Sequence, residues 1–295
     1  MLANLYRKFL PMTTREFIYH FFLGKVLFFF RNFRVIARSK FTFLFSFLLP
    51  KTEENKAFSF MGEYGLTSYP YDYMLEYNRK EIKVETDEER NLPYVSHLGK
   101  RLYFPEFYTT EKVKKDYRAL LIEQDIRSAH RYVRSYGDLD NRVLLDVGAA
   151  EGIFSLDTIE QTQRTIIFEC EEYWLKPLMA TFTPWGHKVT FVKKYVGNKT
   201  AGNFVTIDEF LSNHTKENLF IKMDIEGAER IALEGAAKTL ASGSNIQLAV
   251  CTYHRKGDPE HVAKLLSGYG YSIEFSEGLM YWNKRVSKGV IRCKK

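Results

Sequence analysis

The stretch Val143-Leu144-Leu145-Asp146-Val147-Gly148-Ala149-Ala150-Glu151-Gly152 decides the fold of this 295-residue chain. An apolar run ends in the carboxylate of Asp146 and passes at once into a loop of small residues, and residues 153–159 then begin a helix. A strand, a tight turn and a helix in this order form the nucleotide-binding opening of a doubly wound α/β domain. The next apolar run closes at Glu169, 21 positions after Gly148, close to the ~20-residue spacing at which an acidic side chain reaches a ribose diol.

The glycine pattern distinguishes two cofactor classes that use this opening. A dinucleotide site needs glycines at positions 148, 150 and 153, and the chain has Ala150 and Ile153 at the last two. The pattern D-x-G-x-x-x-G is complete in Asp146, Gly148 and Gly152. It is the loop that S-adenosylmethionine-dependent methyltransferases place under the methionine end of their cofactor. The alternative is a turn that needs glycine only for its backbone conformation.

Strands and helices alternate from residue 143 onwards. Apolar runs predict strands at 143–147, 165–169, 188–192, 219–224, 246–251, 271–275 and 279–282. Helices are predicted near 153–162, 172–182, 206–213, 226–241 and 258–268. This alternation predicts a parallel sheet covered on both faces. Only Ser276-Glu277-Gly278 separates the last two strands, so they must form an antiparallel hairpin.

Polar groups follow four of these predicted strands. They are Asp146, Glu169, Asp224 with Glu226, and Tyr253 with His254. Ligands of doubly wound sheets bind at the carboxyl ends of the strands, so we expect these groups to gather at one site. Lys222 lies inside a strand, where an unpaired ammonium is costly, and one of these carboxylates is its expected partner. Asp224 and Glu226 also precede a helix, and capping that helix is the alternative role for either.

Residues 138–283 resemble the FkbM-type methyltransferases. The matching residues are Asp146-Val147-Gly148-Ala149 with Gly152, Thr206-Ile207-Asp208-Glu209-Phe210, Lys222 to Glu229 in the pattern K-x-D-x-E-G-x-E, and His254. The resemblance implies a Rossmann-like class I methyltransferase fold with a seven-stranded, mostly parallel sheet. It also implies S-adenosylmethionine as donor and a hydroxyl acceptor, often on a sugar or polyketide-like product. Ala150-Glu151 departs from the family, which commonly has Asn and an apolar residue there.

The expected cofactor-binding residues follow from the loop and the next strand end. They are Asp146, Gly148, Ala149, Ala150, Gly152 and Glu169, with Asn198 as a candidate for the adenine contact.

The expected catalytic residues are His254, Asp224 and Glu226. An alcohol must lose its proton as it attacks, which requires a positioned base. His254 is the candidate by residue type and by its place after the fifth strand, and a structural histidine is the alternative. Asp224 is expected to orient His254 or the acceptor, or to hold the cofactor's ammonium. Two carboxylates without further ligands do not predict a metal site, so none is expected.

The first fifty residues carry all the excess charge of the chain. They hold eight basic side chains, one acidic side chain and 12 of the 24 phenylalanines, whereas the rest holds 35 basic and 35 acidic groups. Charges interrupt every window of the ~20 apolar residues that a bilayer span requires. The pattern predicts an interfacial helix with a wide apolar face and a cationic edge, held by anionic lipid. A helical pair packed on the core is the alternative, and so much phenylalanine argues against nucleic acid.

Four regions result from this division of the chain. They are the basic, Phe-rich interfacial segment 1–50, a cap at 51–137, the methyltransferase core 138–284 and a basic tail at 285–295. The cap is expected to contain a hairpin around Leu98-Gly99-Lys100 and a helix from Thr110 to about Tyr136. His130, near the end of that helix, is interpreted as a surface histidine.

Three scattered cysteines favour a reducing compartment. We therefore expect a cytoplasmic O-methyltransferase, peripheral on the inner face of the membrane, that acts on a sugar hydroxyl of a surface glycan or glycolipid. A soluble small-molecule acceptor and a catalytically inactive binding module are the alternatives.

Overall fold

The computed structural model describes residues 24–213, 218–242 and 245–295. The chain divides into two compact units, Met1–Pro70 and Tyr71–Lys295. Each unit is built around its own contacts and is described by itself.

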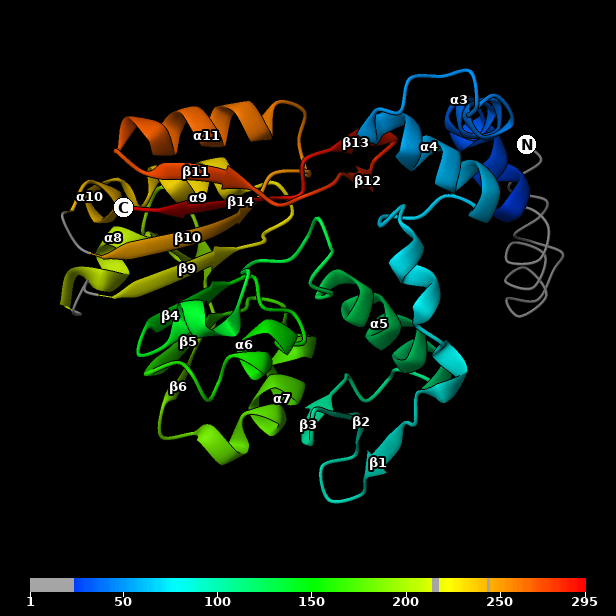
Figure 1. The fold of residues 1–295 in the computed structure, drawn as a ribbon. Coiled ribbons are helices and arrows are strands. Elements are labelled where there is room, and N and C mark those ends of the chain that lie inside the picture. Colours follow the sequence, from blue (N-terminus) through cyan, green and yellow to red (C-terminus); the bar gives the residue numbers. More distant parts are fainter. Residues whose placement is uncertain (1–23, 214–217, 243–244) are drawn as a thin grey trace, which may run out of the picture. The chain divides into compact units, whose positions relative to one another are not determined.

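The described part of the first unit, from residue 24 onwards, contains the packed helices α3 (Gly24–Leu44) and α4 (Glu53–Tyr64) (Figure 1). Thr52 caps α4 by accepting a hydrogen bond from the Asn55 N–H. The predicted helix of this segment is thus present from residue 24, its earlier part lies outside the described residues, and its place at a membrane interface stays a prediction. Residues 41–44 are the last residues of α3, and turns follow at 45–48. Within the described ranges, no helix is both long and apolar enough to cross a bilayer.

The second unit begins with short elements and a small sheet. Their bounds are η2 (Asp72–Glu76), η3 (Arg79–Glu81), β1 (Glu85–Asp87), β2 (Leu92–His97), β3 (Lys100–Tyr103) and α5 (Thr110–Glu123). The predicted hairpin is confirmed, since β2 pairs antiparallel with β3 around Leu98 and Gly99, both at positive φ.

The predicted helix 110–136 is too long, because α5 ends at Glu123. Two side chains supply the turn chemistry that stops it. Asp125 accepts the Arg127 N–H at 2.8 Å, and Ser128 accepts the His130 N–H at 3.1 Å. Residues 128–133 are all buried, which a helix with one solvent face does not allow.

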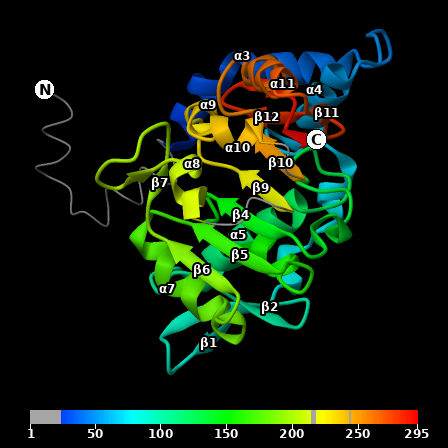
Figure 2. The ribbon, with the colours of Figure 1, turned by 90° about the vertical axis from the view of Figure 1, so that its left-hand side faces the viewer.

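A seven-stranded sheet forms the centre of the second unit. Its strands are β4 (Val143–Val147), β5 (Arg164–Phe168), β6 (Val189–Val192), β9 (Leu219–Met223), β10 (Ile246–Cys251), β11 (Ser272–Phe275) and β14 (Val290–Lys294). Their order is β11-β14-β10-β9-β4-β5-β6, and only β14 runs against its neighbours. Figure 2 shows β6, β5, β4, β9 and β10 side by side in this order. The expected class I methyltransferase sheet, with six strands in one direction and one reversed, is confirmed.

The identity of the reversed strand was predicted wrongly. Residues 279–282 contribute β12 (Met280–Trp282), which pairs with β13 (Arg285–Ser287) in a separate ribbon. The sheet strand is β14, inside the segment interpreted as a basic tail. Arg292 and Lys294 concealed its period-two pattern, in which Ile291 and Cys293 face the core.

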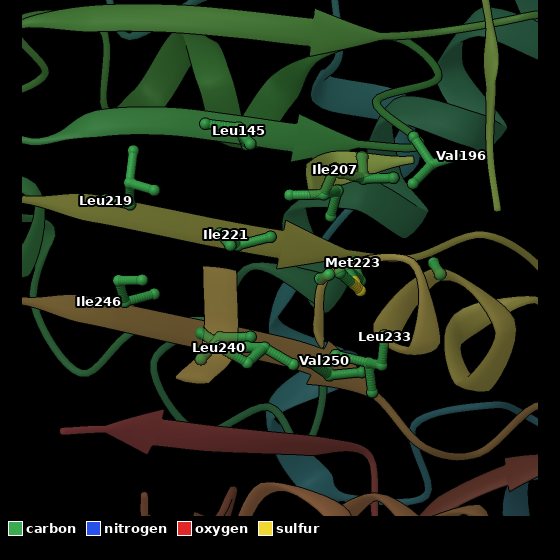
Figure 3. Packing of buried hydrophobic residues seen from close by; sticks show 14 of the residues in the cluster. Leu145, Val196, Ile207, Leu219, Ile221, Met223, Leu233, Leu240, Ile246 and Val250 are labelled. Carbon is green, nitrogen blue, oxygen red and sulfur yellow. The ribbon is translucent and has the colours of Figure 1, made fainter. Parts of the chain in front are cut away.

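Helices cover both faces of the sheet. One face carries α8 (Ile207–Phe210), α9 (Glu229–Glu234), α10 (Ala237–Ala241) and α11 (Asp258–Gly268); the other carries α5, α6 (Ile153–Asp157) and α7 (Glu172–Thr181). Figure 3 shows Leu145, Ile221 and Val250 of adjacent strands beside side chains of the first group, such as Ile207 and Leu240. Burial on both faces explains why these strands read as continuous apolar runs. The remaining short elements are η4 (Tyr136–Leu139), η5 (Thr183–Trp185), β7 (Tyr195–Val196), β8 (Phe204–Val205) and η6 (Leu211–Asn213).

The predicted helix 226–241 is two helices that meet at Gly235. A Cβ at Gly235 would lie 1.9 Å from the Gly197 carbonyl oxygen, so α9 and the loop after β7 touch through backbone. Asp208 accepts the N–H groups of Lys238 and Thr239 at 2.8 and 2.7 Å and thereby caps α10. Asp208 of the Thr206–Phe210 motif is therefore structural.

We predict that β14 is essential to stability. Ile291 is completely buried, so Ile291→Ala is expected to lower the free energy of unfolding by about 2–5 kcal/mol. Lys294→Ala, on an exposed side chain of the same strand, should change it by less than about 0.5 kcal/mol. Urea denaturation of both variants measures the two changes in the free energy of unfolding. Equal changes would show that β14 does not contribute to the hydrophobic core.

Candidate active site

The loop after β4 approaches the segment after β9 through backbone alone. Gly148 has φ 80°, and a Cβ there would lie 2.0 Å from the Asp224 carbonyl oxygen. Gly152 has φ 79°, and a Cβ there would lie 2.7 Å from a Leu178 methyl group. Both glycines of the D-x-G-x-x-x-G pattern are therefore required by positive φ and by close contact.

A buried ion pair holds this loop from behind. Asp146 and Lys222 are register partners on the neighbouring strands β4 and β9, and their charged atoms lie 2.9 Å apart. Lys222 also donates to the Gly148 carbonyl, and the Ser155 hydroxyl donates to Asp146 at 2.7 Å. Burial alone would lower the pKa of Lys222, but the carboxylates of Asp146 and Asp224 raise it. The expectation that a carboxylate pairs with Lys222 is confirmed.

A cleft of about 400 Å³ lies at the carboxyl ends of β4, β5 and β9. It lies where the strand order reverses, the usual ligand site of such sheets. Five of the predicted site residues line it: Gly148, Ala150, Glu169, Asp224 and Glu226. The aromatic residues Tyr173, Trp174, Tyr195 and Phe204 line it as well.

Four expected cofactor residues do not line this cleft. Asp146 is buried against Lys222 and Ser155, while Ala149 packs in the core and Gly152 begins α6. These three shape the loop. Asn198 is bound elsewhere, since its amide donates to Glu234 at 2.8 Å, and the structure does not bring it to the site.

Glu169 fixes the loop from the end of β5. One carboxylate oxygen accepts the Ala150 N–H at 2.9 Å, and the other accepts the Glu171 N–H at 2.7 Å. Burial raises the pKa of Glu169, although these backbone hydrogen bonds oppose the rise. The same carboxylate faces the cleft, at the place where the spacing to Gly148 predicted a ribose contact.

Asp224 lies between two histidines. Its Oδ2 accepts the Tyr132 hydroxyl at 2.8 Å and lies 3.3 Å from His130 Nε2, while its Oδ1 lies 3.5 Å from His254 Nε2. Burial alone would raise the pKa of Asp224, but the hydrogen bond with His130 and the nearby positive charges lower it well below its usual range. Asp224 is therefore ionised at neutral pH.

The imidazole of His254 is oriented by Glu229. Glu229 Oε1 lies 2.8 Å from His254 Nδ1 and also accepts the N–H groups of Ile225 and Gly227. This acceptor assigns the proton of neutral His254 to Nδ1 and leaves the lone pair on Nε2.

His254 Nε2 forms no hydrogen bond with any described residue. It lies 3.5 Å from Asp224 Oδ1 and 3.6 Å from Glu226 Oε2. Burial alone would lower the pKa of His254, but the hydrogen bond with Glu229 and the adjacent carboxylates raise it. His254 does not itself line the cleft, but its accepting nitrogen lies directly behind Asp224 and Glu226, which do.

The interpretation of His130 as a surface residue is wrong. It is 1% exposed, and its Nε2 lies 3.1 Å from the Tyr253 hydroxyl. Its other nitrogen lies 3.3 Å from Glu123. The charge of Glu123 acts on a second group as well: burial and this charge together raise the pKa of the Glu151 carboxyl to about 8. The sequence signal for this region is the turn chemistry at 125–128, which ends the helix and directs the next residues inward.

Among the residues that the structure describes, two triplets of potential metal ligands share Asp224. They are His130 with Asp224 and Cys251, and Asp224 with Glu229 and His254, and the ligand atoms within each lie within 4.8 Å of one another. Hydrogen bonds already join members of each triplet, and burial raises the pKa of the Cys251 thiol well above its usual value. The absence of a metal stays a prediction.

A sheet of this order, with a glycine loop after β4 and an acidic residue after β5, defines a class I methyltransferase. The methyltransferase FkbM domain matches residues 104–273, more than half of the sequence. The chain belongs to the FkbM methyltransferase family, for which S-adenosylmethionine is the expected cofactor.

Solved structures of methyltransferases are similar to this chain at low identity. The methyltransferase FkbM of Methylobacillus flagellatus KT is 20% identical over 64% of this chain and 56% of its own, with a TM-score of 0.43. The magnesium protoporphyrin IX methyltransferase of Synechocystis PCC 6803, solved with bound S-adenosylmethionine, is 17% identical over 62% of this chain and 83% of its own, with a TM-score of 0.37. No curated protein matches the sequence.

Proposed function

We propose that this protein is an S-adenosylmethionine-dependent O-methyltransferase that acts on a sugar hydroxyl of a glycan or glycolipid. The observation that carries the proposal is His254, whose accepting nitrogen has no hydrogen-bond partner among the described residues and lies beside two residues of the cleft. S-Adenosylmethionine, when bound, supplies an already activated methyl group, so alignment of the acceptor provides much of the rate.

The residues of the cleft fit this cofactor. The glycine loop lines the cleft with backbone, because any side chain at position 148 would clash with the segment after β9. Glu169 offers carboxylate oxygens for two ribose hydroxyls. Tyr195 and Phe204 stack at 5.3 Å in the same wall and offer an apolar surface for an aromatic base. In this proposal, Tyr195 and Phe204 make the adenine contact for which the sequence had suggested Asn198.

The acceptor hydroxyl would deliver its proton to His254 Nε2 as it attacks. Glu229 then holds the Nδ1 proton and stabilises the imidazolium that forms. Asp224 lies next to the same nitrogen and, being ionised, orients it or the acceptor hydroxyl. Glu226 has a largely exposed side chain at the mouth of the cleft and is a further contact for the acceptor.

The charge of this region favours an uncharged acceptor. The carboxylates of Glu123, Asp224, Glu226 and Glu229 each lie within 3.6 Å of a nitrogen of His130 or His254. Such an environment repels phosphate and carboxylate groups but accepts neutral hydroxyls, which are abundant on sugars. A lipid-linked sugar would also explain why this enzyme acts as a peripheral protein at the inner face of a membrane.

Methyl transfer from labelled S-adenosylmethionine tests the acceptor class. The full chain is incubated with neutral methyl hexosides, with a glycolipid extract and with soluble metabolites. We expect label in sugar-containing products, where an ether survives mild alkali and mass spectrometry locates the methyl group on oxygen. Alkali-labile label indicates a methyl ester and contradicts the proposal, and label confined to soluble non-sugar metabolites favours the small-molecule alternative.

We predict that Glu169 contributes to cofactor affinity. Glu169→Gln keeps an acceptor for only one of the two backbone N–H groups and leaves a ribose hydroxyl poorly paired, at a cost of about 1–3 kcal/mol. Calorimetric titration with S-adenosylmethionine measures the loss without any acceptor. Glu160→Gln, at an exposed position outside the cleft, is the matched control. Equal affinity for both variants would remove Glu169 from the site.

We predict that His254→Gln lowers kcat by about 10²–10⁴-fold and leaves cofactor affinity unchanged. Because the surrounding carboxylates raise the pKa of His254, and only the unprotonated base is active, the wild-type rate should rise with pH through a value above the usual 6.5. His187→Gln, on an exposed histidine, serves as control. A normal rate for the His254 variant would transfer the base assignment to Asp224.

A further inference from the structure

Helix α3 buries its polar side and exposes its apolar side. The residues that it buries are Asn32, Val35, Ser39 and Thr42. Phe29, Phe30, Phe33 and Phe41 lie on the opposite side, with exposures of 43, 71, 53 and 56%. A surface helix in water has the reverse arrangement, with its apolar stripe toward the core. The sequence of α3 therefore suits an apolar phase outside the protein.

The contact between α3 and α4 resembles helix packing in lipid. A Cβ at Gly62 would lie 2.2 Å from the Ser39 carbonyl oxygen, so the two backbones nearly touch. Asn32 and Thr42 satisfy their polar groups within α3, by donating to the carbonyls of Phe28 and Arg38. Small residues at close contacts and internally bonded polar side chains are typical of helices that pair in a membrane.

The exposed phenylalanine face is flanked by positive charge. Helix α3 carries five basic residues and no acidic one. Arg38 is used inside the unit, where it pairs with Glu54 at 2.8 Å and lies over the Phe58 ring. No ion pair of Arg31 or Arg34 is found among the described residues, and helical spacing places Arg34 beside Phe30 and Arg31 beside the exposed Phe28. This charge is complementary to anionic headgroups.

We propose that α3 lies in the interface of an anionic phospholipid membrane with its phenylalanine face inserted. Interfacial helices combine an inserted apolar face with cationic edges, and each basic group near an anionic surface adds to binding. The exposed side chains of Phe45, Phe47 and Leu48 extend the apolar surface beyond the end of the helix. This inference concerns the first unit alone and holds whichever acceptor the second unit methylates.

Vesicle co-sedimentation of the full chain tests the inference. We compare vesicles of phosphatidylcholine with vesicles that contain 30% phosphatidylglycerol, a fraction on the order used to mimic anionic leaflets. Wild-type protein should bind the anionic vesicles and release at high salt. Arg31→Gln with Arg34→Gln should weaken this binding by about tenfold or more. Phe30→Ser with Phe33→Ser should weaken binding at low and high salt alike, since it removes inserted apolar area.

Matched control variants distinguish the effect of α3 from a general loss of surface charge or apolar surface. Lys80→Gln with Lys199→Gln removes two exposed charges of the second unit, and Ile126→Ser removes an exposed apolar side chain there. All variants should keep the wild-type thermal unfolding profile and cofactor affinity. The inference is overturned if the full chain binds neither vesicle, if controls lose as much binding as the α3 variants, or if the phenylalanine pair instead abolishes a dimer of this chain.

Discussion

The buried pair of Lys222 and Asp146 is the interaction on which the site depends. Their positions are fixed by the parallel register of β4 and β9, so the pair forms only when the two strands align correctly. Removing either partner would leave an unpaired charge inside the sheet, which is among the costliest single defects. Because Lys222 also holds the Gly148 carbonyl, the same pair sets the loop that faces the cleft. The register of β4 and β9 therefore also determines the geometry of the loop that faces the cleft.

The two histidines on either side of Asp224 are arranged in the same way. His130 and His254 each direct Nε2 toward Asp224 and Nδ1 toward a glutamate, Glu123 in one case and Glu229 in the other. The two differ modestly in access, since His130 is 1% exposed, whereas His254 is 8% exposed and lies beside the exposed Glu226. His130 therefore serves as a counter-charge for Asp224, and His254 remains available for proton transfer under the proposed function.

The sequence was sufficient for features that depend on local chemistry. Apolar runs located the strands, the turn at Leu98 and Gly99 located a hairpin, and the K-x-D-x-E-G-x-E pattern located the charged centre. It was insufficient where long-range packing decides. Arg292 and Lys294 made a sheet strand look like a solvated tail, because charged side chains can alternate with buried ones at a sheet's interior. His130 was misjudged because its burial is created by segments more than a hundred residues away.

The place of β14 has a consequence for synthesis of the protein. It is the last sheet strand in chain order, yet it lies in the interior of the sheet between β10 and β11. Until β14 has been synthesised, β10 therefore presents an open edge and β11 has no partner in the sheet. Unpaired edges of apolar strands invite aggregation, and this sheet is complete only once β14 has been inserted between β10 and β11. Chaperone binding at that stage would protect the β10 edge until β14 arrives.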